Sequence, residues 1–320
     1  MVRYGAKASN MHIIRASLKG HHLLSIRDLT TKDIKSIFSL TSDMEKIVRD
    51  RRCIDFLHGK IMATIFFQPS TRTRLSFESA MFRLGGSVLT FGNPEATRAG
   101  TKCGETLADT ARVINNYADL VVIRHPLVGS ANSFAQYADV PVINGGDGEG
   151  PGSEHPTQAL IDLYTISKVF GQINGITMLI VGGMQIRVGH SLLLAIARFF
   201  HVRILIHCPD SLWLSKDEEA ELRMLGLNYH RVESMEEALL EADVIYHNGW
   251  KESTPEPIPD EYQITAAKLT RVPKHAIVMD ALPRTGAISP DVDTTPYACY
   301  FKQASNGVPI RMALLAHLLG

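Results

Sequence analysis

The stretch Ser70–Arg74, with the sequence S-T-R-T-R, follows an apolar run at Ile61–Phe67. The apolar positions after it recur at helical spacing: Leu75, Phe77, Met81 and Leu84. This order predicts a buried strand, a turn, and a helix whose first residues carry hydroxyls and guanidiniums. The N–H groups and the positive dipole end of such a helix attract an anion. The stretch therefore predicts a phosphate socket, although Ser and Thr are also ordinary N-caps and taken alone leave both interpretations open.

Three further segments place polar groups where a predicted strand ends or a helix begins. They are Val122–Pro126, Glu154–Tyr164 and Asp280–Arg284. Short apolar strands alternate with amphipathic helices along the chain. The predicted strands are Leu120–Ile123, Val142–Asn144, Thr177–Val181, Val202–His207, Val244–His247 and Ala276–Asp280. This alternation predicts an α/β fold with parallel sheets and helices on both faces, and ligands at the carboxyl ends of the strands.

Length and composition bound the class of protein. At 320 residues and 45% hydrophobic content the chain is long enough for two domains. Its formal net charge of zero gives no field that would attract nucleic acid, and no apolar run is long enough for a membrane span. Four scattered cysteines fit a reducing compartment, so we expect a cytoplasmic enzyme without nucleic-acid or membrane partners. The first 25 residues hold bases and no acid, a bias that a transit peptide shares, and are interpreted as a short extension.

A dinucleotide site is the main alternative for the strand at Thr177–Val181. Gly182 and Gly183 follow that strand, but the next glycine is Gly189, so the G-x-G-x-x-G spacing is not formed. The glycine pair is therefore interpreted as a tight strand-to-helix turn.

Taken together, S-T-R-T-R, the H-P-T-Q sequence at His155–Gln158 and the segment Asp280–Arg284 resemble the aspartate/ornithine carbamoyltransferase family, and its aspartate branch most closely. The resemblance extends from about Leu24 to the C-terminus and includes G-E-T-L-A-D-T at Gly104–Thr110. It implies a transferase that uses carbamoyl phosphate, in pyrimidine biosynthesis for the aspartate branch. It also implies a homotrimer or a multiple of trimers.

The resemblance also implies a domain organisation. The carbamoyl phosphate domain would be residues 1–154 with 307–320, and the acceptor domain residues 155–306, because the family's last helix returns to the first domain. The glycine-rich stretch 145–153 is the natural boundary. The family position at Leu282-Pro283 has a cis peptide bond, which would turn loop carbonyls into the site.

The family's donor-site residues match this chain position by position. The resemblance implies that the phosphate is held by Ser70, Thr71, Arg72, Thr73 and Arg124, the carbonyl oxygen by Thr73, Arg124 and His155, and the amide nitrogen by Gln158 and the backbone of Ala281 and Leu282. Arg72, Thr73, Arg124, His155 and Gln158 would thus be the catalytic set. No metal, cofactor or covalent nucleophile is needed, since positioning and electrostatics suffice. Taken singly, Arg124 fits a surface ion pair, His155 a turn and Gln158 a solvent-facing position; the joint pattern favours the chemical roles.

The acceptor side departs from the aspartate branch. Arg187 matches the family arginine that binds an acceptor carboxylate, but Asn248–Lys251 stands where that branch has T-R-x-Q, so Gly249 replaces the second arginine. Cys103 replaces a lysine of a mobile loop, beside Lys102. The usual His-Pro is Asp280-Ala281, and Gln68 replaces a glutamate. The acceptor-binding set is predicted to be Arg187, Lys251, Asp280, Pro283 and Lys102.

These departures leave the acceptor open. An anion at Asp280 would disfavour a second carboxylate and favour a cation, unless its own backbone satisfies it. We expect an acceptor amine with at least one carboxylate, either aspartate, an aspartate-like molecule or a diamino acid. The alternative is a catalytically weak regulatory or assembly subunit that binds carbamoyl phosphate.

Overall fold

The computed structural model describes residues 18–91, 93–99, 104–250 and 257–320. The chain divides into two compact units. Unit 1 is Met1–Asp147 with Asn306–Gly320, and unit 2 is Gly148–Ser305. The division after Asp147 falls inside the glycine-rich stretch, whereas the boundary at residue 154 stays a prediction.

Unit 1 is built on a four-stranded parallel sheet in the order β2-β1-β3-β4. Its strands are β1 (Ile61–Phe66), β2 (Ser87–Phe91), β3 (Leu120–His125) and β4 (Val142–Asp147). Its helices are α1 (Thr31–Arg49), α2 (Thr71–Arg83), α3 (Leu107–Ile114), α4 (Ser130–Ala135) and α10 (Gly307–Leu319), with short 3₁₀ turns at Ile26–Asp28 and Pro94–Ala96.

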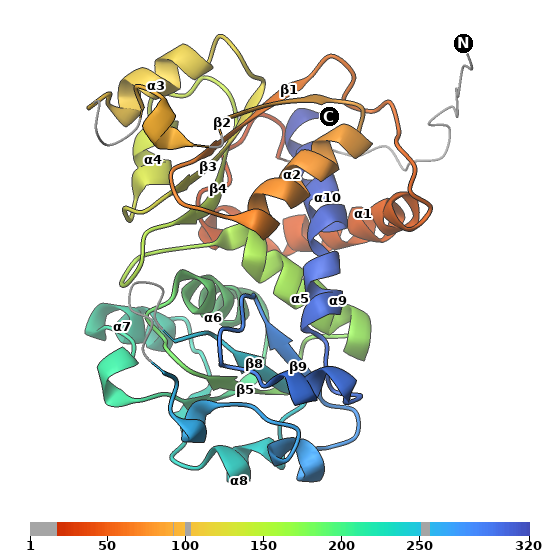
Figure 1. The fold of residues 1–320 in the computed structure, drawn as a ribbon, viewed down its shortest axis with the longest axis vertical. Coiled ribbons are helices and arrows are strands. Elements are labelled where there is room, and N and C mark those ends of the chain that lie inside the picture. The colour runs from red at the N-terminus through yellow and green to blue at the C-terminus, as the bar shows by residue number, and fades with distance from the viewer. Residues whose placement is uncertain (1–17, 92, 100–103, 251–256) are drawn as a thin grey trace. The chain divides into compact units, whose positions relative to one another are not determined.

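The helices of unit 1 cover both faces of its sheet (Figure 1). Ala111 of α3 and Phe134 of α4 pack against Ile65 and Ile123 of the central strands. On the other face, α10 contacts α1 and α2. A helix that is apolar around most of its circumference belongs in a core, and nearly every residue of α10 is buried.

Unit 2 has a five-stranded parallel sheet in the order β7-β6-β5-β8-β9. Its strands are β5 (Thr177–Val181), β6 (Arg203–His207), β7 (Tyr229–Arg231), β8 (Val244–His247) and β9 (Ile277–Asp280). Its α-helices are α5 (Pro156–Phe170), α6 (Arg187–Phe199), α7 (Lys216–Met224), α8 (Met235–Leu239) and α9 (Tyr300–Ser305). The 3₁₀ helices are Asp210–Leu212, Asp260–Tyr262, Lys268–Arg271 and Pro290–Thr294.

The predicted fold class is confirmed, and so are the buried strands. Each predicted apolar run became a strand, and Thr177–Val181 and Val244–His247 match to the residue. The sequence prediction omitted β2 and β7. Both are edge strands with mostly exposed side chains, so neither has the continuous apolar run of a strand buried on both faces.

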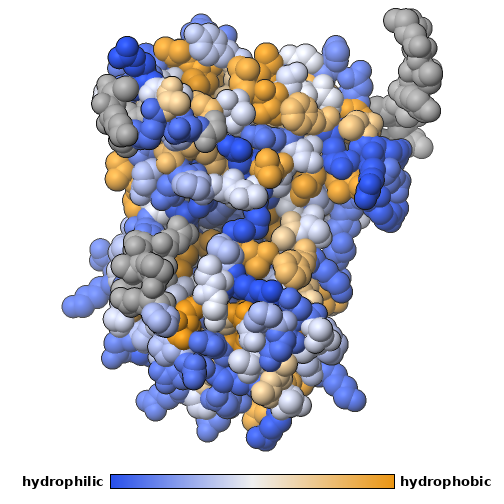
Figure 2. Space-filling model, viewed as in Figure 1, coloured by the Kyte–Doolittle hydropathy of each residue, from blue (hydrophilic) through white to orange (hydrophobic). Residues whose placement is uncertain are grey.

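The surface hydropathy, the helix lengths and the state of the cysteines bear on the class of protein. On the face shown in Figure 2, hydrophobic residues are interspersed with hydrophilic ones and some lie next to one another. Within the described ranges, no helix combines the length and apolar character that crossing a bilayer requires. Cys53, Cys208 and Cys299 are free thiols. Cys103 lies outside the described residues.

Candidate active site

In unit 1, the predicted phosphate socket lies at the N-terminus of α2. Ser70 is the N-cap, and its hydroxyl accepts a hydrogen bond from the Thr73 N–H at 3.3 Å. Thr73 is buried, while Thr71 and Arg72 are exposed. The first turn holds no acid, so the positive end of the helix dipole is not neutralised there.

The two arginines of this turn differ in their surroundings. Arg74 forms an ion pair with Glu78, one turn along α2, at 3.6 Å, and Glu78 also accepts a hydrogen bond from Thr64 at 3.1 Å. Arg72 is exposed at the start of the helix. The exposed position of Arg72 on the first turn of α2 suits contact with a bound anion.

Arg124 lies at the same edge of the unit 1 sheet. It is the next-to-last residue of β3, in register with Phe66 of β1, and its carbonyl accepts a hydrogen bond from the Phe67 N–H at 2.8 Å. The Arg124 guanidinium donates to the Gly145 carbonyl at 3.2 Å. Parallel pairing therefore brings Arg124 and the turn after β1 to one carboxyl edge, as the sequence predicted.

In unit 2, His155 is the N-cap of α5 and Pro156 is its first residue, where a missing N–H costs nothing. The His155 side chain is buried, with 4% of its surface exposed. Its backbone N–H donates to the Ser191 hydroxyl of α6 at 2.8 Å. Ser191 in turn donates to Glu154 at 3.2 Å, so α6 fixes the start of α5.

Arg187 begins α6 and is almost completely buried, with 1% of its surface exposed. Its guanidinium donates to the Gly148 carbonyl at 2.6 Å. A buried guanidinium at a helix N-terminus is a strong anion-binding group, because desolvation strengthens its attraction for a carboxylate.

A buried ion pair supports the loop that leads to His155. Nε2 of His190, on α6, lies 2.9 Å from Glu218 of α7, and His190 Nδ1 lies 3.2 Å from the Ser153 carbonyl. Burial alone would raise the pKa of Glu218, but the attraction and hydrogen bond of His190, with hydrogen bonds from Ser215, lower it to about 2. Glu218 also accepts from the Gly152 N–H at 3.3 Å.

The glycine pair after β5 forms the expected tight turn. Gly182 has φ of +101°, and a Cβ there would lie 2.2 Å from the Gly249 carbonyl oxygen. The Gly183 N–H donates to that same oxygen at 3.0 Å. Glycine at positions 182 and 183 therefore lets this turn approach residues 248–250, the start of the acceptor loop that follows β8. The turn interpretation is confirmed.

Two residues of the acceptor loop also have defined surroundings. The Asn248 amide donates to the Gly183 carbonyl at 2.6 Å. The Trp250 ring packs at 5.0 Å from the Tyr262 ring, centroid to centroid, which is the arrangement of a loop anchor. Lys251 and Lys102, both predicted to bind the acceptor, lie outside the described residues.

The turn after β9 carries the predicted cis peptide bond between Leu282 and Pro283, so that prediction is confirmed. Leu282 has φ of +60°, a conformation rare for a side chain of its size and frequent at functional sites. Asp280 is buried, with 4% of its surface exposed, and accepts a hydrogen bond from the Leu282 N–H. The sequence left open that the backbone next to Asp280 satisfies its carboxylate, and this hydrogen bond is such a contact.

Asp162, which has no predicted role, is connected to Gln158 by a hydrogen bond. Asp162 Oδ1 accepts hydrogen bonds from Gln158 at 2.8 Å and from Gln303 at 2.7 Å, and Oδ2 accepts from the Tyr246 hydroxyl at 3.0 Å. The spacing of Gln158 and Asp162, one helical turn, was the only signal in the sequence. Burial raises the pKa of Asp162 to about 6, although these hydrogen bonds oppose the rise.

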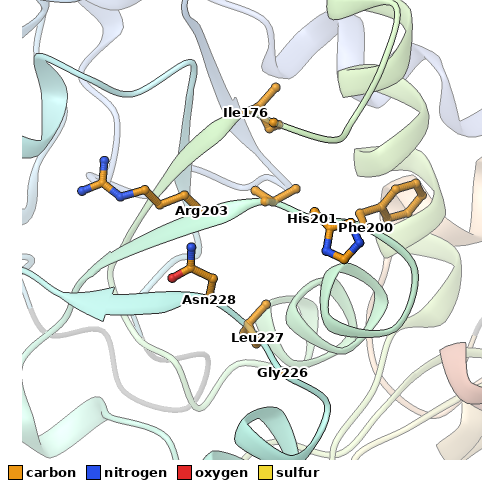
Figure 3. A pocket seen from close by; sticks show the side chains of 9 residues that line it. Ile176, Phe200, His201, Arg203, Gly226, Leu227 and Asn228 are labelled. Carbon is orange, nitrogen blue, oxygen red and sulfur yellow. The ribbon is translucent and has the colours of Figure 1, made fainter.

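A pocket of about 290 Å³ lies elsewhere in unit 2. Residues just before β5, β6 and β7 line it, at the opposite end of the strands from His155 and Arg187, and none of the predicted site residues is among them. In Figure 3 the Arg203 side chain extends away from Phe200 and His201. Arg203 forms an ion pair with Glu241 at 2.6 Å. The pocket is therefore separate from the predicted chemistry.

Each unit thus gathers its own share of the predicted residues at a carboxyl edge. In unit 1 these are the residues of the α2 turn and Arg124; in unit 2 they are His155, Gln158, Arg187, Asp280, Leu282 and Pro283. Donors for an anion, a buried histidine and one amide side chain suit a transferase that binds and polarises its substrates. Among the described residues, no cluster of three metal-ligating side chains occurs.

Comparison with known proteins identifies the class. Residues 21–168 match the carbamoyl phosphate-binding domain of aspartate/ornithine carbamoyltransferases, and residues 174–318 match the aspartate/ornithine-binding domain. The chain belongs to the aspartate/ornithine carbamoyltransferase family. The predicted family and enzyme class are therefore confirmed.

Its relatives fall in the aspartate branch. The aspartate carbamoyltransferase catalytic subunit of Thermococcus gammatolerans is 42% identical over 311 residues, covering 94% of this chain and 98% of the relative. That of Archaeoglobus fulgidus is 43% identical, covering 93% and 99%. The structure of Trypanosoma cruzi aspartate transcarbamoylase with carbamoyl phosphate and aspartate is 35% identical, with a TM-score of 0.87, covering 95% and 98%.

Proposed function

We propose that this protein transfers the carbamoyl group of carbamoyl phosphate to the amine of an amino acid whose carboxylate binds Arg187. The observation that carries the proposal is that the family's donor-site residues are present at the carboxyl edges of both sheets. Ser70, Thr73 and Arg124 come from unit 1, and His155 and Gln158 come from unit 2.

The chemistry follows from these groups. The neutral amine attacks the carbonyl carbon, and negative charge grows on the carbonyl oxygen, where Thr73, Arg124 and His155 act as donors. The tetrahedral intermediate then breaks its bond to the phosphate oxygen. The former amine gives up its extra proton to the leaving phosphate oxygen. Phosphate therefore leaves as the dianion HPO₄²⁻, held by Arg72 and the N–H groups of α2.

For the acceptor, we propose an amino acid with one carboxylate, such as a diamino acid, in preference to aspartate. By the family resemblance, Arg187 matches the arginine that binds an acceptor carboxylate, and Gly249 stands where the aspartate branch has a second arginine. Asp280 accepts a hydrogen bond from the Leu282 N–H and is not needed to explain the preference. One guanidinium neutralises one carboxylate, so a second carboxylate would need another cation, and Gly249 supplies none.

Steady-state assays of ureido product with a panel of amino acids test this proposal. We expect saturable turnover with carbamoyl phosphate, and a higher specificity constant for a diamino or monocarboxylate acceptor than for aspartate. A specificity constant for aspartate of about 10⁴ M⁻¹s⁻¹ or above would return the chain to the ordinary role of its relatives. Carbamoyl phosphate binding without turnover on any amine would instead favour the weak regulatory subunit.

The variant Gly249→Arg tests the reason for the preference. Among the residues that the structure describes, a Cβ at this position has only the end of the Ile186 side chain within contact distance, at 3.2 Å, although φ is +82°. The matched control is Gly249→Ala, which has the same backbone cost and no cation. We expect only the arginine variant to raise the specificity constant for aspartate, by about 10-fold or more. An equal response of both variants contradicts the role assigned to residue 249.

A further inference from the structure

Asp162 is a carboxylate with no exposed surface and three hydrogen-bond donors. The donors come from three elements, Gln158 on α5, Tyr246 on β8 and Gln303 on α9. Burying a carboxylate carries a large desolvation free energy, and a neutral residue of similar size fills the same space without it. Packing alone therefore does not explain why a charged residue occupies this position.

The ionised carboxylate determines which way the Gln158 amide faces. A carboxylate accepts hydrogen bonds only, whereas an amide has one donating and one accepting end. Because Gln158 Nε2 donates to Asp162 Oδ1 at 2.8 Å, its Oε1 is directed to the other side of the amide. The amide nitrogen of carbamoyl phosphate is a donor and needs this accepting end.

Gln303 connects Asp162 to the turn after β9 in the same way. Its Nε2 donates to Asp162 at 2.7 Å, and its Oε1 accepts from the Asp280 backbone N–H at 2.9 Å. The carbonyls of Ala281 and Leu282 follow directly. One carboxylate thus connects both elements that are expected to hold the amide end of the donor.

We propose that Asp162 is a positioning residue for carbamoyl phosphate, which holds the Gln158 amide with its oxygen toward the carbamoyl nitrogen and joins it through Gln303 to the turn after β9. This inference rests on the proposed function. It adds a residue that need not touch the substrate.

Asp162→Asn weakens the hold on this geometry. Asn has one neutral accepting oxygen in place of two charged ones, so the hydrogen bonds that orient the Gln158 and Gln303 amides lose their charge-assisted strength. By calorimetry without acceptor, we expect the dissociation constant of carbamoyl phosphate to rise by 10-fold or more. That of inorganic phosphate, which has no amide, should stay within about 3-fold.

A double-mutant cycle separates positioning from a general structural role. Gln158→Ala alone should weaken carbamoyl phosphate binding by a similar factor, and adding Asp162→Asn to it should cost less than 3-fold more. Asp243→Asn is the matched control: Asp243 accepts from the Thr177 N–H at 2.8 Å at the far end of the unit 2 sheet. That variant should leave carbamoyl phosphate affinity unchanged.

Each outcome is decisive. If Asp162→Asn costs as much in the Gln158→Ala background as in the parent, Asp162 does not act through Gln158 and the proposal is overturned. A second variant, Asp162→Ser, removes the buried charge with a smaller side chain. Equal loss of phosphate and carbamoyl phosphate binding in both variants would assign Asp162 to folding alone and also overturn it. Failure of the parent to bind carbamoyl phosphate would refute the proposed function itself.

Discussion

Replacing Glu218 with Gln should destabilise unit 2 in a pH-dependent manner. Glu218 accepts hydrogen bonds from Ser215 at the start of α7 and from the Gly152 N–H, and it forms an ion pair with His190, so it connects α7 and α6 to the loop before His155. The Gln side chain has nearly the same shape, but its NH₂ must face one of these donors. The structure therefore predicts the loss of one charged contact and one new mismatch between donors.

The size of the effect follows from the pKa of Glu218, which falls from its ordinary 4.5 to about 2. Such a change corresponds to about 3 kcal/mol of stability at neutral pH. Because the folded-state pKa is the lower one, the unfolded chain binds the proton more tightly. The stabilisation is complete above pH 4.5 and is lost as the pH falls toward 2, with about 1.4 kcal/mol left at pH 3.

Denaturant unfolding followed by tryptophan fluorescence measures this effect, because Trp213 and Trp250, the two tryptophans of the chain, both lie in unit 2. The control is Glu237→Gln, which makes the same charge change at an exposed position of α8 and should cost less than about 0.5 kcal/mol. If both variants unfold alike at pH 7, or if the Glu218→Gln deficit does not narrow by pH 3, the reasoning is wrong.

Three other outcomes are expected. Arg72→Ala should weaken carbamoyl phosphate binding by about 1.5–3 kcal/mol, or about 10- to 150-fold, in calorimetry; Arg83→Ala, at the other end of α2, is the control and should bind normally. Turnover should rise with pH as the acceptor amine loses its proton, and His155→Ala should be slower at every pH, since His155 is assigned as a donor to the oxyanion; equal rates would remove that role. Sedimentation of the active protein should give a trimer or a multiple of trimers, and an active monomer would exclude this assembly.

The sequence predicted those features that depend on local patterns. Continuous apolar runs gave the buried strands, and the order strand, turn, helix gave the start of α2 and of α5. The edge strand β7 was missed because Tyr229–Arg231 has no buried face to impose a pattern. Local patterning predicts a strand well only where burial on both sides constrains its composition.

The Asp162 cluster was beyond prediction for a different reason. Asp162 is 4 residues from Gln158 but 84 from Tyr246 and 141 from Gln303. Only the first pair is visible as a helical spacing, and an i,i+4 pair of this kind is also an ordinary surface feature. The function of a buried polar group depends on which distant donors reach it, and that requires the tertiary structure.

The acceptor loop shows how specificity can change while the fold is retained. Its backbone is held by main-chain bonds, from Asn248 N–H to the Val181 carbonyl at 2.9 Å and from Gly183 N–H to the Gly249 carbonyl at 3.0 Å. These bonds do not depend on the side chain at residue 249. If residue 249 is the second arginine position, as the family resemblance implies, glycine there removes a charge from the acceptor side while these main-chain bonds keep the loop in position. For this reason we expect the acceptor preference, rather than carbamoyl phosphate binding or stability, to distinguish this protein from its aspartate-specific relatives.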